Sequence, residues 1–413
     1  MYLEDSFVNE KGSNHQLLKK NNHNLIKKFI YRNSPVSRVE IAHQLGLTTA
    51  TITGMVNPMI SAGLLRETVA QTDESKGAGR PRMMLEFVSD AYYVCGVDVG
   101  VYRTSYVLTD ILGHVVAIRH TDQPLDEYQV TLERLSREIP GFLEKAAIPE
   151  EKILGVGICL PGMIDGSADK IYDIFYDGWT EHNLCAELGQ RLGLKVEVEN
   201  NVRARAISAE LFDRMVKAEP FAYFFVSFGI ACQMIIDGRV LYGQSAAAGE
   251  IGHTVVQHNG PVCPTCGNRG CLEALTGERA ILQQCRDIMA TDTPTVLKEL
   301  CRDAGKLTMD QVLEAQKLGD KAVSHVIEDA IEYLGIALAN TINLISPRSV
   351  VLEGRILSTP RNQERMLRIV DQYMFHIHSG MTDFRFLPYD PDRGARDHLV
   401  ISETLCFFLV LYI

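Results

Sequence analysis

Apolar residues in the first sixty positions recur at the spacing of amphipathic helices. This pattern predicts one helix around residues 25–30, closed by Pro35, and two more in SRVEIAHQLG and TATITGMVNPMISAG. Ser37 and Thr48 stand where N-caps are expected, and Gly46 suits a tight turn between the last two helices. The apolar residues that carry the pattern are Leu25, Ile26, Phe29, Ile30, Ile41, Ala42, Leu45, Ile52 and Val56. Three short helices with this turn predict a helix-turn-helix.

The third predicted helix has small side chains on its outer face. Thr48 caps it, and Thr49, Ala50, Thr51 and Thr53 are expected to point outward. Hydroxyl groups suit phosphates, and a short methyl side chain suits thymine methyl groups at close approach in a major groove. We therefore predict that these five residues contact DNA.

A hairpin is predicted after this helix, in the segment SKGAGRPRMMLEF. Gly77 and Gly79 supply the turn, and Arg80 and Arg82 make its tip basic. Arginine gains from the concentrated negative potential of a narrow minor groove, so both arginines are candidates for DNA contact. The prediction is a winged helix-turn-helix over residues 15–88. The alternative is a small helical protein-interaction domain with a solvated basic face, and the wing favours DNA binding.

Charge divides the chain at a similar place. The net charge is −11, but residues 1–90 hold 11 Lys and Arg against 9 Asp and Glu, whereas residues 91–413 hold 30 against 43. Between Lys11 and Arg66 there are eight basic residues and one acidic residue. A basic module attached to an acidic body is typical of a DNA-binding domain joined to another domain.

From Tyr92 onward, strand-like runs such as YYVCGVDVG, ILGVGICLP and FAYFFVSFG alternate with helical stretches, which indicates an α/β body over residues 92–413. The 413 residues exceed a single core, so two or three domains are expected. Ten cysteines without an apolar leader favour a reducing, cytoplasmic location. The apolar run Leu405–Ile413 is shorter than the roughly twenty residues that a bilayer requires, so no membrane insertion is expected.

The segment Gly249–Glu273 contains one imidazole and three sulfurs, from His253, Cys263, Cys266 and Cys271. Zinc takes four tetrahedral nitrogen and sulfur ligands, and a Cys-x2-Cys clip lets two sulfurs reach one ion. The alternative is a set of buried free cysteines that act as small hydrophobes. The spacing favours a structural zinc site.

Two further pairs of residues belong to this segment. Gly267 and Gly270 permit positive-φ turns that fold Cys271 back toward the other ligands. A closed zinc site already has its four ligands without Glu250 and Glu273, so these two carboxylates are expected to face a substrate or an effector.

The order Gly-Glu-Ile-Gly-His, nine residues, then Cys-x2-Cys-Gly-x2-Gly-Cys-Leu-Glu closely resembles the signature of the ROK family of repressors, open reading frames and sugar kinases. Many members have one residue between the first two cysteines, where this chain has Pro264 and Thr265. A two-residue spacer is the commoner zinc clip, so the metal prediction stands. The resemblance implies a winged helix-turn-helix followed by a two-lobed, actin-like and ribonuclease-H-like body with a cleft between the lobes.

In the kinases of this family a sugar lies in the cleft, and the resemblance carries its contacts over to this chain. The matching positions are Gly162, Trp179, Asn200, Asn201, Glu250, His253 and Glu273. Carboxylates and amides can satisfy vicinal hydroxyl groups, and an aromatic side chain can cover an apolar ring face. Zinc would act indirectly, by fixing His253 and the loop that carries Glu273.

Three departures from the kinase pattern argue against phosphoryl transfer. Asn201 stands where a carboxylate should accept the proton of the attacking sugar hydroxyl, and a neutral amide is not a base. The first phosphate loop, Asp-x-Gly-Gly-Thr in the family, reads DVGVY at residues 98–102. The second reads SFGIACQ at residues 227–233, where Phe228 and Gln233 are expected to crowd a nucleotide.

Together these features predict a sugar-responsive transcriptional repressor and not an enzyme. It is expected to be a homodimer or homotetramer that binds a palindromic operator, with affinity set by a sugar or sugar phosphate in the cleft. Structural Zn2+ is the predicted cofactor. One alternative is an active ATP-dependent sugar kinase with a fused DNA-binding domain. Another is a regulator whose main ligand is a protein, as with relatives that are sequestered by a phosphotransfer-system protein.

Overall fold

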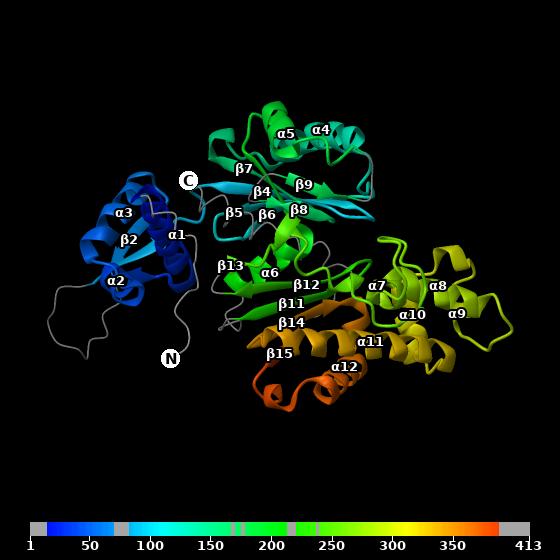
Figure 1. Ribbon diagram of the computed structural model, residues 1–413. Helices are drawn as coiled ribbons and strands as arrows, with labels where there is room; N and C mark the ends of the chain where they lie inside the picture. The colour runs from blue at the N-terminus through cyan, green and yellow to red at the C-terminus, as the bar shows by residue number, and fades with distance from the viewer. Residues whose placement is uncertain are drawn as a thin grey trace.

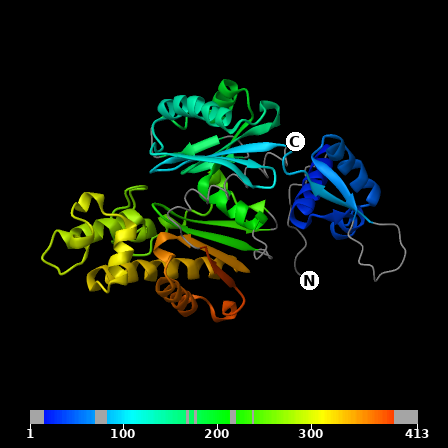
Figure 2. The same cartoon turned by 180° about the vertical axis from the view of Figure 1, so that it is seen from behind.

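The computed structural model describes residues 15–69, 82–166, 170–174, 178–212, 220–236 and 239–387. Figure 1 shows a small N-terminal unit and two larger lobes, each built on its own sheet. Figure 2 shows the same arrangement from behind, with the N-terminal unit to one side of the lobes. No helix among these described residues combines the length and the apolarity that a membrane crossing requires.

The N-terminal unit packs three helices against a small antiparallel sheet in the order β1-β3-β2. Its elements are α1 (His15–Asn33), β1 (Val36–Ser37), α2 (Arg38–Leu45), α3 (Thr49–Ser61), β2 (Leu65–Val69) and β3 (Met83–Phe87). The core contains apolar side chains from all three helices, and those with no exposed surface include Ile26, Ile30, Ile41, Ile52 and Val56. The helical spacing in the sequence therefore predicted the three helices correctly.

The predicted helix caps are confirmed. The Ser37 hydroxyl accepts a hydrogen bond from the backbone N–H of Glu40, whose carboxylate accepts from the Ser37 backbone N–H. Gly46 ends α2 in the left-handed conformation, with φ of 64°. Thr48 caps α3 by accepting from the N–H of Thr51 at 3.1 Å. These caps fix the turn between α2 and α3.

The first lobe contains a five-stranded sheet in the order β10-β7-β4-β5-β6. Strands β4, β7 and β10 are parallel, and β5 and β6 are added antiparallel at one side. Its elements are β4 (Tyr93–Val99), β5 (Thr104–Asp110), β6 (Val115–Thr121), α4 (Tyr128–Ala146), β7 (Ile153–Leu160), β8 (Met163–Asp165), β9 (Lys170–Asp173), α5 (Leu184–Leu192) and β10 (Val196–Asn200). The next helix, α6 (Asn201–Phe212), contacts strands of both lobes.

The second lobe repeats this topology with the strand order β15-β14-β11-β12-β13. Here β11, β14 and β15 are parallel, and β12 and β13 are antiparallel additions. The strands are β11 (Phe221–Val226), β12 (Ile230–Ile236), β13 (Arg239–Val240), β14 (Ser349–Gly354) and β15 (Asp383–Phe386). Two lobes with one repeated sheet topology are what the ribonuclease-H-like prediction requires.

Helices and short 3-10 turns complete the second lobe. They are η3 (Gln244–Ala246), η4 (Ile251–His253), α7 (Leu272–Thr276), α8 (Glu278–Met289), α9 (Leu297–Leu300), η5 (Ala304–Lys306), α10 (Met309–Lys317), α11 (Lys321–Ile345), η6 (Arg355–Leu357), α12 (Pro360–Tyr373) and η7 (His376–His378). The long helix α11 buries one face against this lobe's apolar core. The core thereby supports the loop between β13 and α7, which carries the candidate site.

The N-terminal unit and the first lobe share a packed junction. Ile111, in the turn between β5 and β6, is 1% exposed and belongs to the apolar core of the N-terminal unit. Its backbone N–H donates to the carbonyl of Ser89 at 3.3 Å, and Lys152 donates to the carbonyl of Asp90 at 3.0 Å. The junction consequently contains both apolar packing and hydrogen bonds.

Candidate functional site

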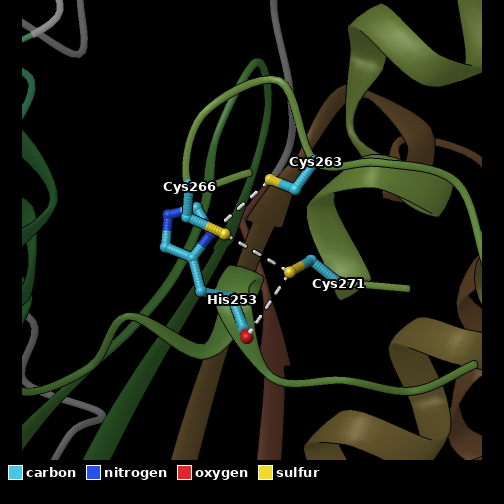
Figure 3. A group of neighbouring side chains, drawn as sticks. All are labelled: His253, Cys263, Cys266 and Cys271. Atoms are coloured by element: carbon cyan, nitrogen blue, oxygen red, sulfur yellow. Dashed lines mark hydrogen bonds between the residues drawn. The ribbon is translucent and has the colours of Figure 1, made fainter. Parts of the chain in front are cut away.

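Four side chains converge in the loop between β13 and α7, as Figure 3 shows. They are His253 from η4, Cys263 and Cys266 from the loop, and Cys271 at the start of α7. Their ligand atoms all lie within 4.8 Å of one another. The predicted ligand set is therefore brought together in space.

The distances within this cluster fit a tetrahedral zinc site. A Zn–S bond of about 2.3 Å implies edges of about 3.8 Å between ligand atoms. The Sγ atoms of Cys266 and Cys271 are 3.6 Å apart, and Cys263 Sγ lies 3.8 Å from His253 Nδ1. One imidazole and three thiols with these separations could hold a zinc ion.

Backbone hydrogen bonds fold the loop around the ligands. The N–H of Cys263 donates to the carbonyl of Asn268 at 2.7 Å, and that of Gly267 donates to the carbonyl of Cys263 at 3.0 Å. Gly267 and Gly270 both have φ of 76°, as the sequence predicted. A Cβ on Gly270 would lie 1.7 Å from the carbonyl oxygen of Gln257, so no other residue fits there.

Glu250 and Glu273 lie beside the cluster. The Oε1 atom of Glu273 accepts a hydrogen bond from the Thr265 hydroxyl at 2.6 Å. Its Oε2 atom lies 3.4 Å from the point where a Cβ on Gly229 or Gly252 would stand, so glycine at both positions leaves room for the carboxylate. The loop that binds the candidate metal thus also positions a carboxylate.

The pKa of the Glu250 carboxyl group is raised, mainly because burial disfavours its charged form. The charges of His253 and Arg203 oppose this effect and lower the pKa of Glu250, whereas the charge of Glu273 raises it further. These interactions show that Glu250, His253 and Glu273 share one electrostatic environment. Two carboxylates and an imidazole gathered there can exchange hydrogen bonds with hydroxyl groups of a ligand.

Two more of the predicted sugar residues, Asn200 and Asn201, lie where β10 ends and α6 begins. Asn200 is 6% exposed and donates from Nδ2 to the carbonyl of Gly162 at 2.8 Å. Its Oδ1 atom accepts from the backbone N–H groups of Val202 and Arg203 at 2.9 Å each. Asn200 therefore anchors the Gly162 loop to the helix. Asn201 is half-buried at the first position of α6.

Trp179 was expected to cover a sugar ring, and the structure corrects this prediction. Its side chain is 1% exposed and lies in the apolar core of the first lobe. The indole N–H donates to the carbonyl of Asp126 at 3.0 Å, and the ring packs edge-to-face on Tyr128 with centroids 5.2 Å apart. A buried and hydrogen-bonded indole presents no free face to a ligand.

A buried charge network near the cleft was missed from the sequence. Arg203 has no exposed surface and donates to Glu199 at 2.7 Å and to the carbonyls of Ile164 and Ala246 at 2.5 and 3.0 Å. The Tyr242 hydroxyl donates to the same carboxylate at 2.8 Å. The only signal in the sequence was the presence of two opposite charges, Glu199 and Arg203, four residues apart where a strand gives way to a helix. The network ties the first lobe to the loop before Glu250.

The two segments that resemble phosphate loops meet between the lobes. Tyr102, which follows β4, and Phe228, between β11 and β12, are in edge-to-face contact with centroids 6.1 Å apart. Gln233 has no exposed surface, and its amide donates to the carbonyl of Ala248 at 3.3 Å. Phe228 therefore contacts a residue of the opposite lobe, whereas Gln233 is buried and supports the turn at Gly249.

The predicted DNA-contact residues fall on one helix and one strand end. Thr48, Thr49 and Ala50 are exposed at the start of α3, whereas Thr51 and Thr53 are partly buried. Arg82 is exposed immediately before β3. Arg80 and the predicted hairpin tip lie outside the described residues.

Comparison with known proteins identifies similar chains. The xylose repressor of Bacillus spizizenii is 30% identical over 342 residues, which cover 83% of this chain and 84% of that protein. The DNA-binding transcriptional dual regulator NagC of Escherichia coli is 27% identical over 351 residues, which cover 83% and 82%. Both alignments extend over most of the two chains.

A solved structure of a ROK family transcriptional regulator, a homologue of the E. coli MLC protein, has the same fold. It matches with a TM-score of 0.81 and 24% identity, and the match covers 96% of this chain and 98% of the other. A ROK hexokinase from Thermus thermophilus also shares the fold, with a TM-score of 0.58 over 78% of this chain and 99% of that chain, at 24% identity. The ROK family model matches residues 94–389, which is more than half of the sequence, and this chain therefore belongs to the ROK family.

Proposed function

We propose that this protein is a sugar-responsive, DNA-binding transcriptional repressor without kinase activity. The observation that carries the proposal is the contrast between two parts of the cleft. Glu250, His253 and Glu273 are gathered beside a metal-type cluster, whereas the two segments that resemble phosphate loops carry the contacting rings of Tyr102 and Phe228. The names of the similar repressors support the same assignment.

The proposed sugar site uses Glu250, His253 and Glu273 from the second lobe. Asn201 supplies an amide from the start of α6, and Asn200 positions the Gly162 loop opposite. Without a carboxylate at position 201, the bound sugar hydroxyl has no base to accept its proton. A sugar held there is bound and not phosphorylated.

The proposed cofactor is a structural zinc ion held by His253, Cys263, Cys266 and Cys271. When bound, zinc supplies rigid tetrahedral coordination that fixes the loop. His253 and the Thr265–Glu273 pair then keep their positions with little loss of conformational entropy on ligand binding. The metal thus acts on sugar affinity through the loop.

Operator DNA is proposed to bind the N-terminal unit. Helix α3 enters the major groove with its N-terminal end, where Thr48, Thr49 and Ala50 are exposed. Thr51 and Thr53 contact the DNA from the next turn of the helix. Arg80 and Arg82 belong to the wing, which contacts the minor groove or the adjacent phosphates. The protein is proposed to form a homodimer or a homotetramer. A phosphotransfer-system protein is a further candidate partner. The expected location is the cytoplasm.

Sugar binding is proposed to act on DNA through lobe closure. The N-terminal unit is packed on the first lobe through Ile111, so it follows that lobe when the cleft closes. In a symmetric dimer this movement changes the spacing of the two recognition helices. By linkage, operator DNA must change sugar affinity by the same factor.

The test is a fluorescence anisotropy titration of the full chain with an operator selected from a random DNA pool. Sugars are added as a panel of pentoses, hexoses and N-acetylated hexoses. At least one sugar is expected to change operator affinity by about fivefold or more, a typical allosteric coupling. The Glu250→Gln variant should bind the operator normally and lose this response. Unchanged affinity across the panel, with intact DNA binding, contradicts the proposal.

A further inference from the structure

A cavity of about 380 Å³ opens beside the proposed sugar residues. The loop side of the cavity includes Thr265 and Glu273, and the helix side is formed by α8. The residues of α8 that line it include Arg279, Gln283 and Arg286, which are spaced by four and then three positions. This spacing places the three side chains on one face of the helix. The cavity therefore has a carboxylate on one wall and two guanidinium groups on the other.

The two arginines have no carboxylate partner among the described residues. Arg286 donates from Nε to the carbonyl of Ala304 at 3.0 Å, which fixes the side chain and leaves its terminal nitrogens available. Arg279 is exposed at the cavity rim. The carboxylate of Glu273 is engaged by the Thr265 hydroxyl at 2.6 Å. Two guanidinium groups that line a cavity and form no ion pair with a described carboxylate favour an anionic ligand.

Tyr102 brings the opposite lobe to this cavity. Its ring contacts Phe228, which also lines the cavity. Burial is the main cause that raises the pKa of Tyr102, followed by the charge of Glu278, and the charges of Arg355, Arg286 and Arg279 lower it in opposition. The phenol of Tyr102 therefore lies within electrostatic range of both cavity arginines.

We infer that this cavity binds the phosphate group of a phosphorylated sugar, with Arg279 and Arg286 on the phosphate and Glu273 on the sugar hydroxyls. This inference rests on the proposed function and specifies its ligand class. Guanidinium forks match phosphate oxygens in geometry as well as in charge. Glu273 belongs both to the cavity and to the sugar residues, so one ligand can span the two. A nucleotide is disfavoured, because the bulky Tyr102 and Phe228 stand where a kinase needs small residues for the backbone to approach the phosphates.

The experiment is isothermal titration calorimetry on the full chain with matched ligand pairs. The pairs are glucose with glucose 6-phosphate and N-acetylglucosamine with its 6-phosphate, and inorganic phosphate is titrated alone. At least one phosphorylated sugar should bind about tenfold more tightly than its parent, the gain expected from charge-assisted hydrogen bonds. The Arg279→Gln/Arg286→Gln double variant should lose this gain and keep the affinity for the parent sugar. Arg302→Gln, an exposed arginine that does not line the cavity, is the control.

The outcomes separate this inference from the proposed function. Parent sugars that bind and shift operator affinity, with no gain from phosphate, overturn the inference and leave the proposed function in place. A gain that survives in the double variant also overturns it. If neither parent nor phosphorylated sugars bind, the inference and the proposed sugar response both fail, even where inorganic phosphate binds and needs both arginines. Melting temperatures of all variants establish that they remain folded.

Discussion

The ring of Tyr102 stands edge-on to the ring of Phe228, with an interplanar angle of 85° and centroids 6.1 Å apart. The two residues come from opposite lobes and from the two segments that resemble phosphate loops. A kinase needs small residues there, because the backbone must approach the phosphates of the nucleotide. The aromatic pair instead contributes an attractive contact between the lobes. The same contact links the lobes directly, and we expect the two rings to obstruct a nucleotide phosphate.

Phosphoryl transfer is expected to be absent, even when the missing carboxylate is restored. Asn201→Asp returns a base to the start of α6 but leaves Tyr102 and Phe228 in place. A coupled ATPase assay over a panel of monosaccharides should therefore give background rates for both the wild type and Asn201→Asp, with a ROK glucokinase as the positive control. Turnover in the wild type that disappears in Asn201→Ala would overturn this expectation.

Loss of one cysteine of the cluster should release zinc. Cys266 is the exposed member of the set, so Cys266→Ser removes a ligand with little disturbance of the core. Metal content measured by mass spectrometry is expected to fall well below that of the wild type, and the sugar response should weaken with it. Cys301→Ser alters a buried cysteine outside the cluster and should retain the metal. Full zinc occupancy in Cys266→Ser would refute the ligand assignment.

The packing of Ile111 should be needed for the signal from the sugar to the DNA-binding unit. Ile111→Ala leaves a cavity in the junction, which costs about 2–5 kcal/mol for buried aliphatic residues. Operator affinity without sugar should change little, whereas the sugar-induced change in anisotropy titrations should shrink. Ile118→Ala, at a position that is 42% exposed on β6, is the matched control. An unaltered response in Ile111→Ala would show that the signal takes another path.

Arg82 should contribute to DNA affinity through phosphate or minor-groove contact. Arg82→Gln removes one exposed positive charge beside β3. Operator affinity should fall for every sequence tested, and the slope of log K against log salt should lessen by about 0.9 per lost phosphate contact. Lys195→Gln, on the first lobe, should leave both quantities unchanged. Equal salt slopes in the wild type and Arg82→Gln would exclude a phosphate contact.

Lys27 should make the stability of the N-terminal unit depend on pH. This residue is 1% exposed in α1, and burial lowers its pKa from 10.5 to about 8. Between these values the unfolded chain binds more protons, so the free energy of unfolding should rise as pH increases through that window. Below the folded pKa the destabilisation is fully present, on the order of 3 kcal/mol.

Urea unfolding of the wild type and Lys27→Met tests this dependence. The difference between the two unfolding free energies should change from about pH 7.5 to about pH 9.5, because only the wild type carries the titrating group. Lys28→Met, its partly buried neighbour, serves as the control. A constant difference across this range would contradict the prediction.

Local chemistry in the sequence determined a large part of this protein. Capping residues and helical spacing define α2 and α3, because those interactions involve neighbours within four residues. The candidate ligand set His253, Cys263, Cys266 and Cys271 was also readable, since its members lie close together in the chain and Cys and His are the usual ligands of structural zinc sites. The prediction that position 201 cannot supply a base needed only its residue type, because the amide of Asn201 is neutral.

Tertiary structure decided the features that depend on distant segments. Trp179 is an aromatic residue of the kind that stacks on sugar rings, but the structure buries it in the core of the first lobe. The contact of Tyr102 with Phe228, and the cavity lined by Arg279 and Arg286, join elements from separate parts of the fold. The fold of the two lobes brings these side chains together. The sequence pattern does not report the spatial distance between residues that are far apart in the chain. Packing alone determines which polar groups face a ligand and which are satisfied inside the protein.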